Sequence, residues 1–521
     1  AIQGGTPDTT RGGYDLSKTS TFGTLYLNSS SGAYTFVPNG AAIEGQASGT
    51  RVQNDFVFEV SDGTLSQSTG LTIWVVGEGD PPILSDGNDA AALTEGNSTL
   101  TSSGSLTLSD SDLSDAVNLG TTLVTSGTTT ATLPSHATLL GMFNLSPTHL
   151  LDDASTTTGT VGWSFNSGAE HFDFLAEGET LVLTYTVTAT DTGSPALSDT
   201  TTVTITITGT NDGPALVAPA TVALTDTTGN DTLSNVSGTL AGTDADHNAV
   251  LTYSIAGQTA GSYSIGGTTY TASKVGQFGT LYLNSSSGAW VYVPNDASVE
   301  ALKQDESEAF SVRVSDGTSS TTQSLNVAVT ASNDTPVLGA IAAMSYTDTA
   351  VDNSFSAISG SLSSVDRDGD AVSYSVTGQV SEVNLINAVR YDLKKVGTYG
   401  TLYLNGNSGA YLFVPDDTAL EGAKTSVNES FSIVASDGTA MDGGLLTVNI
   451  GGSNDTPTLS ASVTSISLTD TAGNDRFNAV TGVLDSTDRD ANDSATYTVV
   501  GDSADSSRSG YDRKLTGTYG T

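Results

Sequence analysis

Apolar and polar residues alternate along most of this chain, and a period of two predicts β-strands with one face on a core. The pattern is clearest just before residues 80, 212, 334 and 455. The apolar positions there are Ile73 and Val75, Ile205 and Ile207, Val327 and Val329, and Val448 and Ile450. The residues between them, which we expect to face solvent, are Trp74, Thr206, Ala328 and Asn449.

A second pattern is the stretch FGTLYLNSSSGA at Phe22–Ala33, which returns unchanged at Phe278–Ala289 and closely at Tyr399–Ala410. It predicts a strand, a tight turn and a second strand, with Leu25 and Leu27 on one face. A third pattern, such as FSVRVSDG at Phe310–Gly317, predicts a strand that ends in an Asp-Gly turn. About seven short strands in ~100 residues, without a convincing amphipathic helix, predict an all-β fold of Greek-key β-sandwiches.

These patterns repeat at an interval of about 120 residues, which is the size of a whole domain. The junction motifs are GEGDPP at Gly77–Pro82, GTNDGP at Gly209–Pro214, ASNDTP at Ala331–Pro336 and GSNDTP at Gly452–Pro457. We therefore expect a tandem array of Ig-like Greek-key sandwiches, arranged as beads on a string. Its parts are the C-terminal portion of a repeat (1–80), a divergent domain (81–212), two complete repeats (213–334 and 335–455) and the N-terminal portion of another (456–521). Because the chain stops inside a hairpin copy, we expect it to be a slice of a longer polypeptide.

Charge and composition narrow the function. Sixteen Lys and Arg against 57 Asp and Glu give a net charge of −41, which excludes a phosphate-binding surface for nucleic acid. The chain has no cysteine, so disulfides and thiolate sites are excluded. No apolar run is long enough to span a bilayer. Such charge predicts either a highly solvated surface or bound cations.

Acidic residues recur at fixed places in each repeat, about 30 residues after each junction. These sets are Asp110 and Asp112; Asp244, Asp246 and Asn248; Asp366, Asp368 and Asp370; and Asp488, Asp490 and Asn492. A further aspartate stands in the turn before each last strand, at Asp191, Asp316 and Asp437. Sandwich topology places junction, Asp-x-Asp turn and later turn at the same end of a domain. Oxygen ligands in this number favour Ca²⁺, although each aspartate could instead cap its turn.

Two familiar calcium motifs do not explain these acids. An EF-hand loop that begins at Asp366 would need Gly and Glu where Ala371 and Thr377 stand. The GGxGxD nonapeptide is also absent.

The stretch WSFNSGAEHFDFLAEGETLVLTYTVTATD at Trp163–Asp191, followed by VTITITGTNDGP, resembles the VCBS repeat of giant bacterial RTX-type adhesins. Units with GTLYLN, VPND, ALEG, VSDG and NDTP resemble variants of it. The resemblance covers essentially the whole chain. It implies an extracellular extender segment on a bacterial surface, serving adhesion, aggregation or biofilm.

The segments Thr188–Pro214 and Thr243–Ile255 are also similar to cadherin repeats, in which calcium lies between consecutive domains. The resemblance implies ligands at Asn211 and Asp212 with Asp244, Asp246 and Asp316; at Asn333 and Asp334 with Asp366, Asp368 and Asp437; and at Asn454 and Asp455 with Asp488 and Asp490. Acids of the preceding domain would be Glu95, Asp226 and Asp348, and also Glu300 and Glu421. The first junction departs from the motif, so Glu78 and Asp80 would have to serve there.

Other functions remain open. A glycan- or protein-binding array would need exposed aromatics, for which Trp74 is the candidate, and the repeats could also pack laterally with like chains into a fibre or sheath. An enzyme is disfavoured: His136, His149, His171 and His247 lack metal-ligand spacing, and no nucleophile or phosphate-loop motif occurs.

Overall fold

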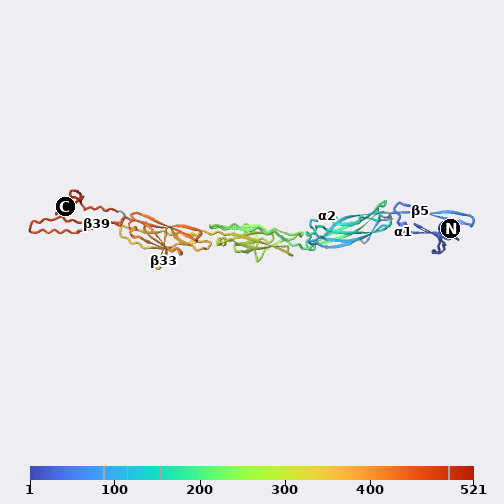
Figure 1. Cartoon of the computed structure of the whole chain (residues 1–521), viewed down its shortest axis with the longest axis horizontal. Helices are drawn as coiled ribbons and strands as arrows, with labels where there is room; N and C mark the ends of the chain where they lie inside the picture. Colours follow the sequence, from blue (N-terminus) through green and yellow to red (C-terminus); the bar gives the residue numbers. More distant parts are fainter. Residues whose placement is uncertain (86–88, 114, 153–154, 491–492, 521) are drawn as a thin grey trace.

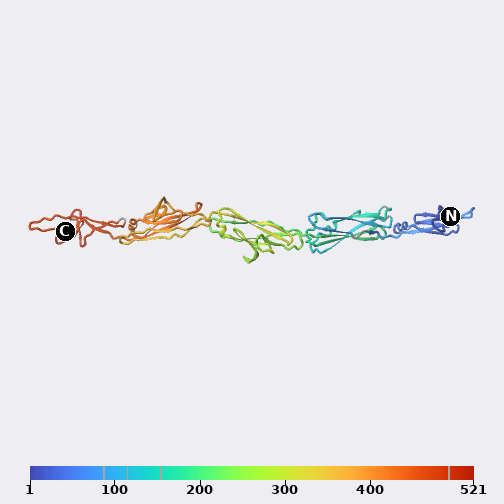
Figure 2. The ribbon, with the colours of Figure 1, turned by 90° about the horizontal axis from the view of Figure 1, so that it is seen from below.

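The structure is a computed structural model that describes all residues except 86–88, 114, 153–154, 491–492 and 521. The described chain is almost entirely β, as the alternation predicts, and its sandwiches follow one another in a long row (Figure 1). The row is equally narrow after a quarter turn (Figure 2). The all-β tandem sandwich fold is therefore confirmed.

The divergent unit consists of two facing sheets. One has the order β12 (His149–Leu150), β10 (Val117–Gly127), β14 (Thr180–Asp191), β15 (Ser198–Thr208) and β8 (Asp89–Thr94). The other has the order β11 (Phe143–Ser146), β13 (Thr158–Asn166), β9 (Thr101–Ser109) and β7 (Ile83–Ser85). The core between them includes Phe143, whose ring stacks on Tyr185 at 4.3 Å and on Trp163 at 5.9 Å between centroids.

The next two units share one topology. In the first, a four-stranded sheet runs β17 (Val222–Thr225), β26 (Ser320–Thr330), β25 (Glu306–Ser315), β20 (Thr252–Ile255), and a five-stranded sheet runs β18 (Val236–Thr239), β24 (Ala289–Pro294), β23 (Gly279–Leu283), β22 (Thr268–Val275), β21 (Thr259–Ile265). In the second, the orders are β28 (Met344–Thr347), β37 (Met441–Gly451), β36 (Val427–Ser436), β31 (Ser373–Val376), and β29 (Ile358–Ser361), β35 (Ala410–Pro415), β34 (Gly400–Leu404), β33 (Val389–Val396), β32 (Val380–Ile386). Each of these units also has a short antiparallel ladder at the end where the chain enters it: β16 (Ala215–Leu216) with β19 (Gly242–Thr243), and β27 (Val337–Leu338) with β30 (Ser364–Val365).

The first long strand of each complete unit pairs in parallel with its last: β8 with β15, β17 with β26, and β28 with β37. Parallel strands begin at the same end of a sheet. The chain therefore comes into a unit at one end and leaves it at the opposite end. This topology places successive units end to end and brings the residues after each first strand beside the next junction.

The repeated hairpin forms part of the core, as predicted. Leu25, Leu281 and Leu402 are fully buried, and each second strand ends at its proline. The glycine that begins the hairpin has a packing role: a Cβ on Gly400 would lie 2.4 Å from Cζ of Phe413. A larger residue at this position would have to displace the neighbouring strand.

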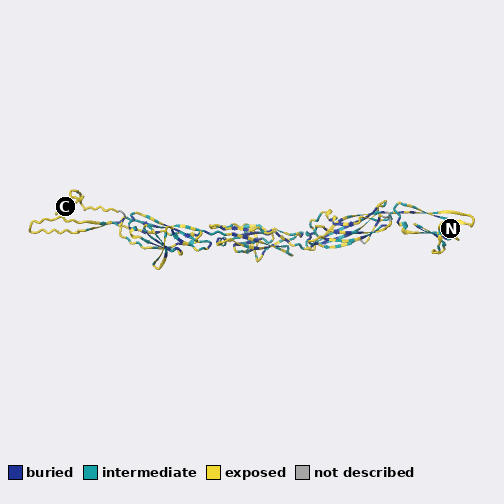
Figure 3. Ribbon diagram, viewed as in Figure 1, coloured by how far each residue is buried: buried dark blue, intermediate teal, exposed yellow. Residues whose placement is uncertain are grey.

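The two ends of the chain form smaller sheets. Residues 1–80 contain β1 (Thr6–Pro7), β2 (Leu16–Ser20), β3 (Gly23–Leu27), β4 (Tyr34–Pro38), β5 (Arg51–Ser61) and β6 (Ser66–Val76). Residues 456–521 contain β38 (Thr458–Ala461), β39 (Leu484–Thr487), β40 (Ser503–Ala504) and β41 (Arg513–Lys514), and most of this part is exposed (Figure 3). The described residues include four separate buried clusters. The four boundaries between the five predicted parts of the chain remain predictions.

In the described residues, four short helices interrupt the strands: α1 (Gly40–Glu44), α2 (His136–Gly141), α3 (Asp296–Val299) and α4 (Asp417–Glu421). In α3 and α4, Val299 and Leu420 are fully buried, and each belongs to the core of its unit at the end where the chain leaves it. The same turns place Glu300 and Glu421 at that end. In the described part of the chain, we find no helix with the length and apolarity needed to cross a bilayer.

Candidate metal centres at the domain junctions

The junction at Asp334 gathers carboxylates from two successive units. Asp334 is fully buried, and its backbone N–H donates to Oδ2 of Asp368 at 2.6 Å. Asp226 and Glu300 come from the preceding unit. One carboxylate oxygen from each of these two residues and from Asp334 lie within 4.8 Å of one another.

In each acid of the preceding unit, one carboxylate oxygen accepts a backbone hydrogen bond. Asp226 directly follows β17, and its Oδ2 accepts from the Ser332 N–H at 2.9 Å. Glu300 follows α3, and its Oε1 accepts from the Asp231 N–H at 2.9 Å. The second oxygen of each carboxylate accepts no hydrogen bond, and neither oxygen of Asp334 accepts one.

On the other side of Asp334, the Asp-x-Asp turn forms a second group, because carboxylate oxygens of Asp366, Asp368 and Asp370 also lie within 4.8 Å of one another. The later turn reaches the junction through Asn333, whose Nδ2 donates to Oδ2 of Asp437 at 3.0 Å. This bond, with those from the Ala440 and Thr439 N–H groups, lowers the pKa of Asp437. Asp437 is thus a satisfied turn cap that also anchors the junction asparagine.

The junction at Asp455 repeats this arrangement. Its N–H donates to Asp490 at 2.6 Å, and its carboxylate groups with Asp348 and Glu421. Asp488 and Asp490 form the second group, together with Asp493. Asn454 donates to the Asp455 carbonyl at 3.0 Å, and Asn492 lies outside the described residues.

The junction at Asp212 has a variant set. The Asp212 N–H donates to Asp246 at 3.0 Å, and Asn211 donates to Asp316 at 3.1 Å. The carboxylate partners of Asp212 are Glu95 and Asp173. Sequence reasoning missed Asp173. It lies in the irregular segment after β13, and the corresponding residues of the next two units are the glutamates Glu300 and Glu421 in short helical turns.

The two remaining candidates at this junction lie in a turn. Asp244 accepts from the Asp246 N–H at 3.0 Å, as a turn cap would. Asn248 is exposed and has a left-handed φ of 60°, a conformation that asparagine tolerates well.

The first junction, at Asp80, has its buried acids in the unit that follows it. The Asp80 N–H donates to Asp112 at 2.8 Å, and the Asp112 N–H donates to Asp110 at 2.9 Å. Asp191, at the end of β14, is buried beside them, as is Asp115. Glu78 is exposed, and among the described residues it belongs to none of the close carboxylate groups.

The pKa values of buried acids at the junctions are shifted upward. Burial, followed by the charges of Glu300, Asp226 and Asp368, raises the pKa of Asp334 to about 7. Burial also raises the pKa of Asp246 and of Asp110 to about 6, with neighbouring acids adding to the effect. The pKa values of Asp212, Asp368, Asp455, Glu300 and Glu421 are raised for the same first cause, burial.

Buried carboxylate oxygens that accept no hydrogen bond indicate what kind of ligand the junctions could bind. In the described part of the chain, buried side-chain polar atoms without a hydrogen-bond partner lie at the junctions, apart from Trp290 Nε1 and one oxygen of Asp505. All of those at the junctions are carboxylate oxygens. A buried ionised carboxylate without a donor is costly unless a cation compensates it. The donors are oxygens only, in numbers and at spacings that suit Ca²⁺ better than softer metals.

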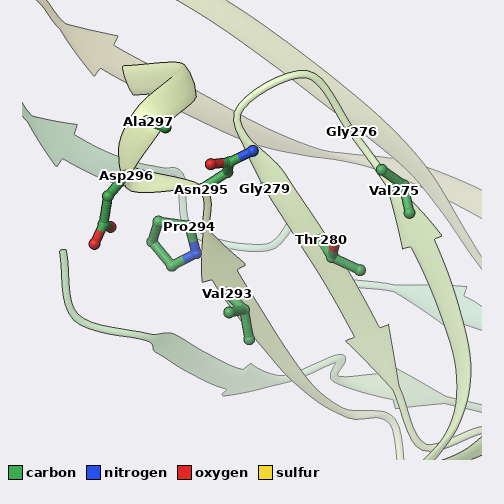
Figure 4. Close-up of a pocket in the computed structure, with 9 residues that line it drawn as sticks. All are labelled: Val275, Gly276, Gly279, Thr280, Val293, Pro294, Asn295, Asp296 and Ala297. Carbon is green, nitrogen blue, oxygen red and sulfur yellow. The ribbon is translucent and has the colours of Figure 1, made fainter. Parts of the chain in front are cut away.

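The pockets show no comparable chemistry. One lies between the hairpin β23–β24 and α3, and Figure 4 shows its lining residues, among which Asp296 points away from Thr280. Asp296 accepts from the Leu233 N–H at 3.2 Å, which is a structural role. A second pocket occupies the matching place beside α4, so the feature belongs to the repeat rather than to a unique active site.

Trp74 is 48% exposed, as the strand pattern predicts, but its ring faces the Arg51 guanidinium at 3.9 Å. One face of the indole is therefore occupied. Trp163 and Trp290 are buried core residues, also as predicted.

Comparison with known proteins gives structural likeness only. No protein-family model and no curated protein matches the chain. Among solved structures, the chain is similar to protocadherin gammaB7 EC3-6, a cis-dimer structure, with 14% identity over 77% of this chain and 84% of that chain and a TM-score of 0.32. It is similar to mouse cadherin-23 EC22-24, with 15% identity over 72% and 99% and a TM-score of 0.31. It is also similar to Drosophila N-cadherin EC1-4, with 12% identity over 84% and 91% and a TM-score of 0.25.

Proposed function

We propose that this chain is an extender segment of a long extracellular adhesin or surface fibre, and that Ca²⁺ at the junctions of its domains makes it rigid. The observation that carries the proposal is the recurrence of unpartnered, buried carboxylate oxygens at each junction between units. The bacterial surface location and the VCBS-type assignment rest on the sequence resemblance alone.

The proposed ligands differ in role. At the central junction, Asp226, Glu300 and Asp334 would hold a cation between the two units, and Asp366, Asp368 and Asp370 would hold one at the top of the second unit. Asn333 and Asp437 would orient this set, since their side chains are already engaged with each other and with backbone groups. The corresponding residues would serve at Asp212 and Asp455.

The mechanical consequence follows from topology. Each unit receives the chain at one end and releases it at the other, so only the short junctions set the angle between neighbours. A cation that binds both units would exclude bent arrangements, because bending separates its ligands. A net charge of −41 would further favour extension through self-repulsion.

The test is a pair of measurements on the full chain, in Ca²⁺ and in chelator. We expect a higher melting temperature and a larger maximum dimension by small-angle scattering in Ca²⁺, since an ion that binds only the folded state stabilises it. Asp366→Asn with Asp368→Asn should reduce both effects. The matched control is Glu59→Gln with Glu382→Gln, which removes the same charge from exposed positions on strands away from the junctions. If Ca²⁺ changes neither quantity in the parent chain, the junction acids are turn caps and the extender mechanism fails.

A further inference from the structure

The junctions share their acidic residues but differ in their basic residues. Some have Lys and Arg side chains beside the acids, and one does not. At Asp334, Lys303 of the preceding unit forms an ion pair with Asp370 of the next. Arg367 of the next unit reaches back to Glu300, with 3.4 Å between Nε and Oε2, and lies 3.8 Å from Asp334. Each unit thus extends one cation across the boundary toward an acid of the other.

The same exchange occurs at Asp455. Lys424 pairs with Asp493, and Arg489 lies 3.8 Å from Glu421 and 3.3 Å from Asp352. These five residues come from both sides of the junction, as before. The recurrence in two successive units makes the paired Lys and Arg a property of this version of the repeat.

At Asp212 both cations are missing from the corresponding positions. Ala176 stands where Lys303 does, Ala245 where Arg367 does, and Asn248 where Asp370 does. The contacts across this boundary include two hydrogen bonds: the His247 N–H donates to the Phe174 carbonyl at 3.0 Å, and the His247 ring lies 3.0 Å from the Thr130 hydroxyl. Among the described residues, neither Lys nor Arg forms an ion pair with the Asp212 group of acids.

We infer that the chain contains two kinds of joint. The joints at Asp334 and Asp455 are latched by their own Lys and Arg side chains and keep neighbouring units aligned when divalent cations are scarce. The joint at Asp212 lacks the latch and becomes a hinge under the same conditions. The inference rests on the proposed function, because the hinge is straightened by the ion proposed there.

The geometry supports the Arg pair as the stronger half of the latch. The Arg367 side chain is 27% exposed and its partner Glu300 only 6%, so water screens this pair less than a surface pair. Lys303 is 54% exposed and contributes mainly by spanning the boundary. Arg367 also faces Glu300 and Asp334 together, so one guanidinium partly neutralises two buried carboxylates from opposite units.

The experiment measures the angle at each joint separately in the full chain. Since the chain has no cysteine, pairs of spin labels can be placed at introduced cysteines, and distance distributions read by double electron–electron resonance. Thr125→Cys with Thr269→Cys spans the joint at Asp212, and Thr269→Cys with Arg390→Cys spans the joint at Asp334; all three positions are exposed. In chelator, we expect the distribution across Asp212 to be at least about twofold wider than in Ca²⁺, and the one across Asp334 to change little.

Two variants test the cause. Lys303→Met with Arg367→Gln should widen the distribution across Asp334 in chelator and leave it narrow in Ca²⁺, whereas Lys394→Met, which removes a pair within one unit, should change nothing. In the parent chain, salt at about 1 M should widen the distribution across Asp334 less than the double variant does, because a screening length of about 3 Å weakens the exposed Lys303 pair more than the largely buried Arg367 pair. Ala176→Lys with Ala245→Arg and Asn248→Asp should narrow the joint at Asp212 in chelator.

The outcomes separate the two ideas. If Ca²⁺ narrows the joint at Asp212 but the joint at Asp334 is equally wide in chelator, the latch is wrong and the extender proposal stands. If the double variant stays narrow in chelator, the latch is also wrong. If Ca²⁺ narrows neither joint in the parent chain, the proposed function itself fails.

Discussion

Replacing Asp334 by asparagine should change stability in opposite directions with and without calcium. Asp334 is fully buried, and neither of its carboxylate oxygens accepts a hydrogen bond. In chelator, the folded chain must keep this charge away from water. Asparagine has nearly the same shape and no charge, so Asp334→Asn should then stabilise the chain. In Ca²⁺ the same substitution removes a proposed ligand and should destabilise it.

The size of the effect follows from the pKa of Asp334. Burial and the neighbouring acids raise it from 3.8 to about 7. A difference of about 3 units corresponds to about 4 kcal/mol of penalty on the ionised form. Local relaxation and water entry reduce such penalties, so we expect a gain of ~1–2 kcal/mol in chelator. For a unit of this size, that is a rise of ~4–8 °C in melting temperature.

The assay is differential scanning calorimetry of the full chain at pH 7.5, which follows the separate transitions of the units. The matched control is Asp437→Asn. Asp437 accepts from Asn333, Thr439 and Ala440, so this change loses a satisfied hydrogen bond. In chelator it should cost about 1 kcal/mol, the opposite direction to the gain expected for Asp334→Asn. If Asp334→Asn lowers the melting temperature in chelator as much as in Ca²⁺, then burial and the neighbouring acids do not outweigh the partial compensation by Arg367, and the electrostatic reasoning is refuted.

Two further predictions concern pH and packing. In chelator, the melting temperature should fall as pH rises from about 5 to about 8, because the folded chain binds more protons than the unfolded chain wherever a folded pKa is raised. The groups responsible are Asp334, with a pKa of about 7, and Asp110 and Asp246, with pKa values of about 6; saturating Ca²⁺ should abolish this slope, and a slope of the same sign and size in Ca²⁺ would contradict the assignment. Gly400→Ala should lower the stability of its unit by ~2–4 kcal/mol in thermal melts, since its Cβ would overlap Phe413 and the Val414 carbonyl, which lie 2.4 and 2.5 Å away. Gly120→Ala, where a Cβ meets nothing within 4 Å, is its control, and equal losses in the two variants would show that packing is not the cause.

The fold was accessible from the sequence because its signals are local. Alternation along β15 and β26 identifies the inward residues without reference to any other strand, and Ile205 and Val327 are indeed fully buried. The repeated hairpin and its closing proline were likewise predicted within a dozen residues. The short turns α3 and α4 were not predicted, since four or five residues are too few to show a helical period.

The junction chemistry was only partly accessible, because it is assembled from residues more than 100 positions apart. The pairing of Asn211 with Asp316 spans 105 residues, and the Thr210 contact with Glu95 spans 115. Recurrence in several units revealed the Asp-x-Asp sets, whereas Asp173 has no counterpart of the same residue type and was missed.

The basic residues show most clearly why local patterns were insufficient. Between two aspartates, Arg367 looks like part of an acidic turn, and Lys303 lies in an unremarkable polar loop. Only the end-to-end arrangement of the units brings one against Glu300 and the other against Asp370. The core tolerates little variation because each strand must pack against its own sheet, but a junction can be neutralised by an ion, by side chains, or by both. In the proposed extender, the same sandwich can therefore be repeated while two or three exposed or half-buried residues set the stiffness of each joint.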